Sequence, residues 1–136
     1  MRDPWLSGLR VLVVEDEAVI SLLITEDLRD FGYEVAGPFS RGSDALAWVR
    51  RNAVDLAILD YELKDGNCLP LARELSTRGI PFMLFSATFG TDRPAELKAV
   101  PWVMKPAGTE ALLDALDRLT ETPGPEIHLA ARALPL

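Results

Sequence analysis

The side chains in this sequence that could do chemistry stand directly after runs of apolar residues. An acidic series, residues 15–17, follows the first such run, and Asp60 follows a later one. Ser86 and Lys105 each follow a further run. Each is ordinary by itself, because an acidic pair often caps a helix and an Asp often begins a turn. Together they supply carboxylates, a hydroxyl and an ammonium group, and their joint occurrence indicates one site.

This set of groups suits the transfer of a phosphoryl group. Carboxylates packed together repel one another, and a divalent cation relieves that repulsion. Oxygen ligands alone favour Mg²⁺ or Mn²⁺ over zinc. A carboxylate can also attack phosphorus and form an aspartyl phosphate. The metal and Lys105 would then neutralise the incoming charge, and the hydroxyl of Ser86 could donate to a phosphoryl oxygen.

The elements that must position these residues follow from the hydrophobic pattern. One run, residues 54–59, is apolar almost throughout, as in a parallel sheet covered on both faces. In an open parallel sheet, ligands bind beyond the carboxyl ends of the strands, so this pattern brings the candidate residues to one edge. The five predicted strands span residues 10–14, 33–36, 54–59, 80–85 and 100–104.

Apolar residues spaced three and four apart predict helices between the strands, which indicates the α/β class. A polar loop is expected over residues 61–67, with a turn at Asp65-Gly66. The five predicted helices span residues 18–31, 43–51, 69–77, 91–99 and 108–120, with Pro106 opening the last. In the first of them, the inward face is expected to consist of Ile20, Leu23, Ile24, Leu28 and Phe31.

Composition narrows the class further. The chain has 136 residues, a net charge of −7 and one cysteine, Cys68, so it fits a single domain without an internal disulfide. The acidic charge argues against nucleic acid as a partner. No apolar run approaches the roughly 20 residues that span a bilayer, and no secretory signal is visible. We therefore expect a cytoplasmic protein with no membrane partner.

The expected organisation is an N-terminal extension over residues 1–8, one domain over residues 9–120 and a tail over residues 121–136. The tail carries several apolar residues, and it could dock on the domain, stay unordered or bind a partner.

The chain resembles a known family in the residues that carry the candidate chemistry. The run from Val11 to Glu17, with Leu59-Asp60, Phe85-Ser86-Ala87 and Lys105-Pro106, is similar to the receiver domain of two-component response regulators, of the single-domain, chemotaxis-receiver-like kind. The resemblance covers residues 9–120. It implies a flavodoxin-like fold, with a five-stranded parallel sheet in the order 2-1-3-4-5 and helices on both faces.

The resemblance also implies roles for single residues. Asp60 is the phosphoacceptor, Lys105 pairs with the phosphoryl group, and Ser86 contacts it in the active state. Trp102, three residues before Lys105, stands where the family has an aromatic switch residue. The family more often has Thr at the position of Ser86 and Tyr or Phe at that of Trp102, so the switch is expected to differ in shape.

A magnesium site is implied in the same way. Asp16 and Asp60 bind Mg²⁺ directly, Glu15 acts largely through water, and the backbone carbonyl of Glu62 completes the protein ligands.

The implied function is signalling rather than catalysis of an external reaction. A sensor histidine kinase phosphorylates Asp60, and the chain then signals by contact with a downstream protein, with homodimerisation left open. The chain ends soon after the last predicted helix, so no DNA-binding or catalytic output domain is expected. One alternative is a Mg²⁺-dependent phosphatase or phosphotransferase of the haloacid dehalogenase kind, which needs a second Asp where this chain has Glu62. Another is a receiver-like module that is never phosphorylated, which would tend to lose an acidic or Lys position.

Overall fold

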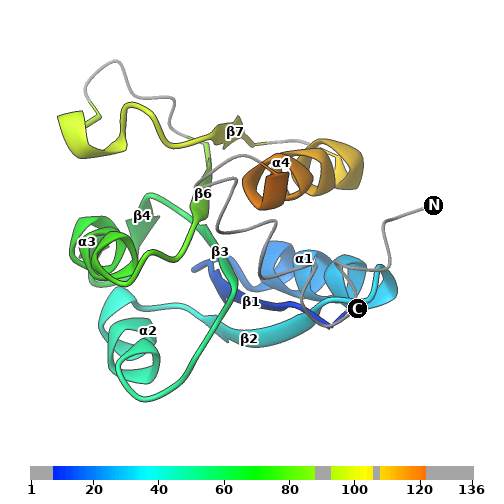
Figure 1. Cartoon of the computed structure of the whole chain (residues 1–136), viewed down its shortest axis with the longest axis horizontal. Helices are drawn as coiled ribbons and strands as arrows, with labels where there is room; N and C mark the ends of the chain where they lie inside the picture. Colours follow the sequence, from blue (N-terminus) through cyan, green and yellow to red (C-terminus); the bar gives the residue numbers. More distant parts are fainter. Residues whose placement is uncertain (1–7, 88–92, 106–107, 122–136) are drawn as a thin grey trace.

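Figure 1 shows the computed structural model of the chain, which describes residues 8–87, 93–105 and 108–121. Its centre is a parallel five-stranded sheet with the order β2-β1-β3-β6-β7. Five strands in this order are the predicted 2-1-3-4-5 arrangement, so the predicted fold is confirmed. The strands are β1 (Arg10–Val14), β2 (Glu34–Phe39), β3 (Leu56–Leu59), β6 (Phe82–Ser86) and β7 (Trp102–Met104).

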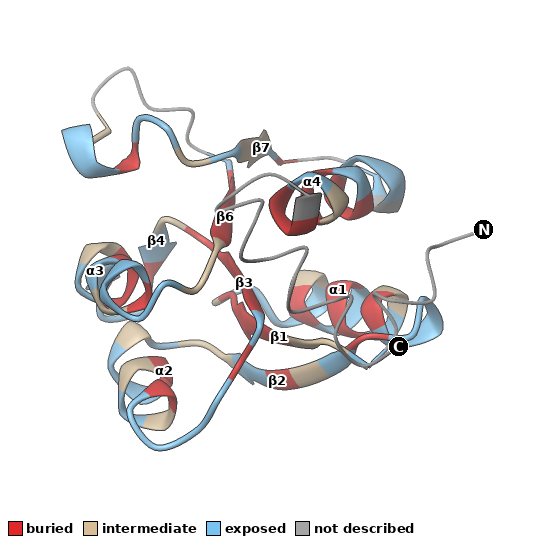
Figure 2. Cartoon of the chain, viewed as in Figure 1, coloured by how far each residue is buried: buried red, intermediate tan, exposed pale blue. Residues whose placement is uncertain are grey.

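Helices cover both faces of this sheet, because the strands are apolar on both sides. In β1, Val11 and Val13 pack in one cluster with residues of α1 and α4, whereas Leu12 and Val14 pack in a second cluster with residues of α2 and α3. The buried residues coloured in Figure 2 follow this layering. The helices are α1 (Ala18–Asp30), α2 (Gly42–Val49), α3 (Leu69–Thr77) and α4 (Thr109–Glu121).

The helix predicted over residues 91–99 is wrong for the described residues of that segment. They contain only a three-residue 3₁₀ turn, η2 (Ala95–Leu97). Pro94 before it is extended, with φ −55° and ψ 150°, and Leu97 is the buried residue of the turn. A segment with one apolar anchor between two prolines has too little to bury to hold a longer helix.

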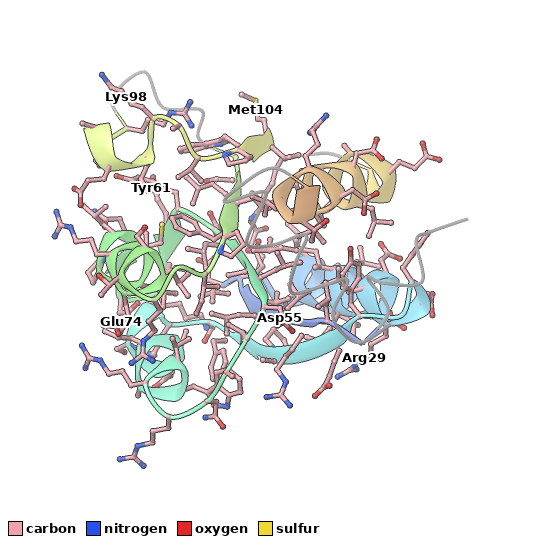
Figure 3. The ribbon with its side chains drawn as sticks, in the orientation of Figure 1. Arg29, Asp55, Tyr61, Glu74, Lys98 and Met104 are labelled. Atoms are coloured by element: carbon pink, nitrogen blue, oxygen red, sulfur yellow. The ribbon has the colours of Figure 1, made fainter. Side chains whose placement is uncertain are left out.

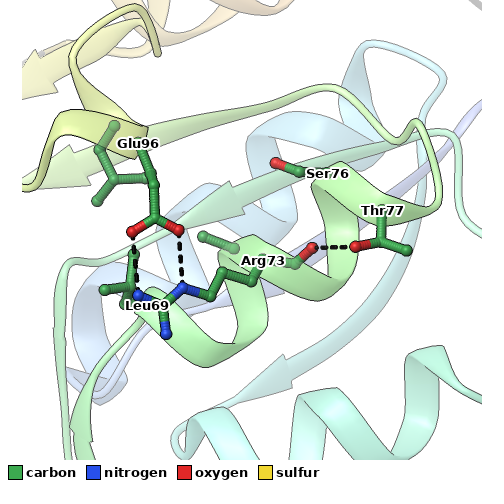
Figure 4. Close-up of a pocket in the computed structure, with 7 residues that line it drawn as sticks. Leu69, Arg73, Ser76, Thr77 and Glu96 are labelled. Carbon is green, nitrogen blue, oxygen red and sulfur yellow. Dashed lines mark hydrogen bonds and ion pairs between the residues drawn. The ribbon is translucent and has the colours of Figure 1, made fainter.

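A groove lies between α3 and η2. The groove has a volume of about 510 Å³ and is crossed by Arg73, whose guanidinium binds the Glu96 carboxylate at 2.7 and 3.0 Å (Figure 4). The residues that line it are Leu69, Ala72, Arg73, Ser76, Thr77, Glu96 and Leu97.

Strand β2 runs three residues beyond its predicted end. The extension passes through Gly37, whose φ is +103° and where a Cβ would lie 2.8 Å from the carbonyl oxygen of Val13. Only glycine therefore fits this close approach of β2 to β1. The extension brings the Phe39 carbonyl within 2.8 Å of the Glu15 N–H, which donates to it.

The predicted polar loop over residues 61–67 contains a small antiparallel hairpin. Its strands are β4 (Glu62–Leu63) and β5 (Gly66–Asn67), with Leu63 opposite Gly66. The chain reverses at Lys64 and Asp65, one residue before the predicted Asp65-Gly66 pair, because Gly66 already belongs to β5, where its φ is +126°. Leu63 is buried in the core, so the hairpin is packed against the domain.

Two further expectations concern burial and the chain ends. On α1, Leu23 and Phe31 are 55% and 44% exposed, so they were wrongly predicted to face inward. Residues 1–7 of the extension predicted over residues 1–8, the opening residue Pro106, and residues 122–136 of the tail predicted over residues 121–136 lie outside the described residues. Within the described part, no helix combines the length and apolar character that crossing a bilayer requires.

Candidate functional site

The carboxyl ends of four strands meet at one edge of the sheet and bring the candidate residues together. Backbone hydrogen bonds continue the strand ladders into the site: the Asp60 N–H donates to the Val14 carbonyl, and the Lys105 N–H donates to the Ser86 carbonyl, both at 2.9 Å. These residues are therefore positioned by sheet register and not by loop conformation.

Lys105 joins the acidic groups to one another. Its ammonium nitrogen lies 2.7 Å from Glu15 Oε1, 3.0 Å from Asp60 Oδ2 and 3.3 Å from Glu17 Oε1. Lys105, Glu15 and Asp60 are 9%, 4% and 6% exposed. The ammonium group is thus largely withdrawn from water and shared among carboxylates from two strand ends.

The acidic residues form a cluster that could hold a cation. Glu15, Asp16, Glu17 and Asp60 each offer a carboxylate oxygen, and these oxygens all lie within 4.8 Å of one another. Glu15 and Asp60 are buried, whereas Asp16 is half-buried and Glu17 is exposed, so the cluster reaches solvent at its α1 end. A donor set of oxygens alone, with fewer ammonium groups than carboxylates, suits a hard divalent cation such as Mg²⁺.

Burial dominates the electrostatics of this cluster. Burial raises the pKa of Glu15 to about 7, although hydrogen bonds from Lys105 and from the Glu17 N–H favour its charged form. For Lys105, burial alone would lower the pKa, but the hydrogen bonds to Glu15 and Asp60 outweigh it and raise the pKa above its ordinary value. The ammonium therefore stays charged, and the carboxylates around it retain excess negative charge.

Ser86 and Trp102 lie on the same face of the sheet. Ser86 is the buried last residue of β6 and pairs with Met104, two residues after Trp102 on β7. Because side chains alternate along a strand, Trp102 and Met104 share a face. Met104 is 45% exposed and points outward from β7 (Figure 3).

Trp102 is held between two residues that the sequence did not single out. Its ring centroid lies 5.8 Å from that of Tyr61, at an interplanar angle of 39°, and the Arg93 guanidinium lies 5.0 Å from the Trp102 ring centroid. Tyr61, labelled in Figure 3, directly follows Asp60. The candidate switch residue Trp102 is thus in contact with the residue that directly follows the phosphoacceptor.

The sequence predicts a role for Glu62 but none for Glu17. The Glu62 N–H donates to Asp60 Oδ1 at 3.3 Å, while a ligand role for its carbonyl stays a prediction. Glu17 was noted in the acidic series but given no role, and the structure places it in the cluster. The signal for Glu17 was its position directly after Asp16, at the start of a helix.

Comparison with known proteins identifies response regulators as the relatives of this chain. The sequence profile of the response regulator receiver domain matches residues 11–117. Among curated proteins, the transcriptional regulatory protein PdtaR of Mycobacterium tuberculosis is 30% identical over 112 residues, covering 79% of this chain and 55% of that protein. The chain thus spans about half the length of this relative.

Solved structures resemble nearly the whole described domain. The non-phosphorylated HemR receiver domain from Leptospira biflexa superposes with a TM-score of 0.75 at 31% identity, covering 87% of this chain and 98% of that one. The response regulator TrrA from Thermotoga maritima, in complex with Mg²⁺ and BeF, gives a TM-score of 0.72 at 28% identity, with 82% and 98% covered.

Proposed function

Because this chain belongs to the response regulator receiver domain family, we propose that it takes a phosphoryl group onto Asp60 from a sensor histidine kinase. A phosphoacceptor role in two-component signalling is the common function of that family. The observation that carries the assignment to Asp60 is its place: a buried carboxylate at the end of central strand β3, with the Lys105 ammonium 3.0 Å away.

The proposed reaction depends on Mg²⁺ and uses these groups as follows. A carboxylate oxygen of Asp60 attacks the phosphorus, a new O–P bond forms, and the bond from phosphorus to the donor imidazole nitrogen breaks. Lys105 compensates the charge on the transferred group, and the Ser86 hydroxyl donates to one of its oxygens. Ser86 is 2% exposed, which favours a contact with a group bound at Asp60 over one with solvent.

Magnesium fits the donor set of the cluster. We assign direct coordination to Asp16 and Asp60, a water-mediated contact to Glu15 and the remaining protein ligand to the backbone carbonyl of Glu62. When bound, Mg²⁺ supplies positive charge that offsets the carboxylates and the phosphoryl oxygens. The burial of Glu15 and Asp60 next to one another supports this assignment, because a divalent cation would offset the cost of holding two carboxylates away from water.

The kinase is proposed to dock on helix α1. This helix begins directly after the acidic cluster, and Val19, Leu22 and Leu23 on it are 70%, 59% and 55% exposed. Such a group of exposed apolar side chains marks a protein contact. We define these three residues as the α1 patch and propose that helices of the kinase bind it while presenting the phosphohistidine to Asp60.

We further propose that the chain is a stoichiometric acceptor and not a turnover enzyme, acting only in its own phosphorylation and dephosphorylation. Output by contact with a downstream protein, with or without a homodimer, belongs to the same proposal. The residue two positions after Asp60 is Glu62, which does not match the second Asp of a haloacid dehalogenase.

Incubation with Mg²⁺ and acetyl phosphate tests the acceptor, with intact mass as the readout. The wild type should gain one base-labile phosphoryl group, Asp60→Asn should gain none, and Asp30→Asn, at an exposed position near the end of α1, should behave as wild type. Labelling of Asp60→Asn to the wild-type extent would show that the acceptor is another residue. Rapid multiple turnover of the donor would favour the enzyme, and an unlabelled wild type would favour the inert module.

A further inference from the structure

Helix α2 is capped by a residue from a distant part of the chain. Its N-cap, Arg41, makes no side-chain capping bond. Instead, the N–H groups of Gly42 and Ser43 donate to Oδ1 and Oδ2 of Asp65, at 2.8 and 2.9 Å. Both oxygens of one carboxylate thus satisfy two of the helix N–H groups that have no partner inside the helix.

Asp65 stands at the tip of the hairpin that follows the phosphoacceptor. At the base of the hairpin, the Glu62 N–H donates to Asp60 Oδ1 at 3.3 Å, and the Cys68 N–H donates to the Tyr61 carbonyl at 2.8 Å. The hairpin therefore has Asp60 at one end and the cap of α2 at the other.

The hairpin is too short and too well packed to let the two ends move independently. Each strand has two residues, and Leu63 is 7% exposed in the core. A Cβ on Gly42 would lie 3.4 Å from Leu63 Cδ1, so the start of α2 and the hairpin are already in close contact. A displacement at Asp65 must then be passed toward Glu62, because a close-packed interior transmits strain.

We propose that Asp65 is a positioning residue for the phosphoacceptor site: by holding the first turn of α2 it fixes the hairpin that begins at Glu62, whose carbonyl is the proposed Mg²⁺ ligand. This inference rests on the proposed function for the identity of that ligand. Asp65 does not touch the reacting atoms and acts through the backbone that it anchors, in the manner of the outer partners that orient metal ligands elsewhere.

The charge of Asp65 makes this anchor persistent. The backbone N–H groups of Ser43 and Gly42 lower the pKa of Asp65 to about 2, so the carboxylate is ionised throughout the neutral range. A negative charge is also favoured at the N-terminus of a helix. An amide at this position would keep one acceptor but lose the charge and the second acceptor.

The test separates magnesium affinity from overall stability. Magnesium binding is measured by calorimetry, and labelling by acetyl phosphate is measured as a function of Mg²⁺ concentration. Asp65→Ala should weaken Mg²⁺ binding about tenfold, the low end for loss of such a partner, while labelling at saturating Mg²⁺ stays close to wild type. Asp65→Asn should be intermediate. A cap with a purely structural role would lower the melting temperature and leave the Mg²⁺ affinity unchanged.

Two further variants act as controls. Asp44→Asn removes another acidic charge from the first turn of α2 and should leave Mg²⁺ affinity as in wild type. Gly42→Pro removes a donor from the α2 side and places its ring against Asp65, so it should reproduce the loss seen with Asp65→Ala. If Asp65→Ala does not fold, the Mg²⁺ affinities of Asp65→Asn and Gly42→Pro still test the positioning role of Asp65.

The outcomes keep the two proposals apart. Equal Mg²⁺ affinity in Asp65→Asn, Gly42→Pro and Asp44→Asn would overturn the positioning role and leave the phosphoacceptor proposal standing. A wild type that is not labelled at Asp60 would overturn the phosphoacceptor proposal, and calorimetry would still report whether Asp65 controls Mg²⁺ binding.

Discussion

The ammonium nitrogen of Lys105 lies closer to Glu15 than to Asp60, at 2.7 Å against 3.0 Å. The cation expected to serve the phosphoacceptor is therefore shared with a neighbouring buried carboxylate. We expect a negative charge added at Asp60 to compete with Glu15 for the same ammonium, and a cation bound near Glu15 to release Lys105 toward Asp60. Such a competition would couple the binding of the metal to that of the phosphoryl group.

Replacing Lys105 should expose the repulsion that it relieves. Lys105→Met leaves Glu15 and Asp60 buried without their shared partner, so the free energy of unfolding should fall by about 3–5 kcal/mol without Mg²⁺. Urea unfolding with and without Mg²⁺ measures this, with Lys98→Met as the control at an exposed position. Equal stabilities of the two variants would contradict the charge balance described for the site.

The stability of the metal-free protein should depend on pH through Glu15. Because burial raises the pKa of Glu15 to about 7, the folded state binds its proton more tightly than the unfolded state does. The stabilisation is complete below the unfolded pKa near 4.5 and is lost as the pH rises through 7, a change on the order of 3 kcal/mol. The difference in stability between wild type and Glu15→Gln should show this trend in EDTA and shrink in Mg²⁺. A pH-independent difference would argue against it.

Asp16 should carry the response to magnesium. Asp16→Asn removes both a proposed ligand and a like charge, so the variant should melt higher than wild type without metal and gain little from Mg²⁺. The gain expected for wild type in millimolar Mg²⁺ is a few degrees, about 1 kcal/mol. Differential scanning fluorimetry measures both. A wild type indifferent to Mg²⁺, or a variant with the full response, would remove Asp16 from the site.

Trp102 should report activation through its emission. Beryllofluoride with Mg²⁺ mimics the phosphoryl group, and the Tyr61 contact links Trp102 to the residue after Asp60. Its addition should change tryptophan emission, and most of the change should vanish in Trp102→Phe but persist in Trp48→Phe, where the ring packs against Phe39. A response that survives in Trp102→Phe would make that residue a packing residue only.

The α1 patch should matter for the kinase and not for a small donor. Leu22→Asp places a charge on a side chain that is 59% exposed, so it should slow phosphotransfer from the kinase found by a panel assay at least tenfold, while labelling by acetyl phosphate is unchanged. Met104→Asp, at an exposed apolar residue on β7, is the matched control. Equal loss in both variants would place the kinase elsewhere.

The residues at the carboxyl edge of the sheet could be predicted because the strands that position them are visible as short runs in the sequence. Alternating and continuous apolar runs define the strands, and the rule that ligands bind beyond their carboxyl ends assigns Asp16, Asp60, Ser86 and Lys105 to one place. The structure places all four there, with backbone hydrogen bonds from Asp60 and Lys105 that extend the ladder.

The missed features depend on contacts between residues far apart in the sequence. The Asp65-Gly66 pair predicts a turn, but nothing local shows that its carboxylate caps a helix 22 and 23 residues earlier. Leu23 fits the helical spacing, yet spacing alone does not say how wide the buried stripe is, and the structure leaves it exposed. For η2, Pro101 marks the end of the predicted helix, but Pro94 is extended in the structure and leaves Leu97 as the buried residue of the turn.

In the described residues between β6 and β7, the short turn η2 stands where a longer helix was predicted, and this changes how that part of the chain can respond. A three-residue turn with one buried side chain, Leu97, has few internal hydrogen bonds and a small apolar contact, so it should open at low cost and separately from the sheet. Arg93, which stacks on Trp102, precedes it by two residues. A change at Trp102 is therefore expected to alter how often the segment around η2 is open. It is not expected to move a helix as a rigid body. The signal would then be a change in how often this segment opens, which amide hydrogen exchange measures.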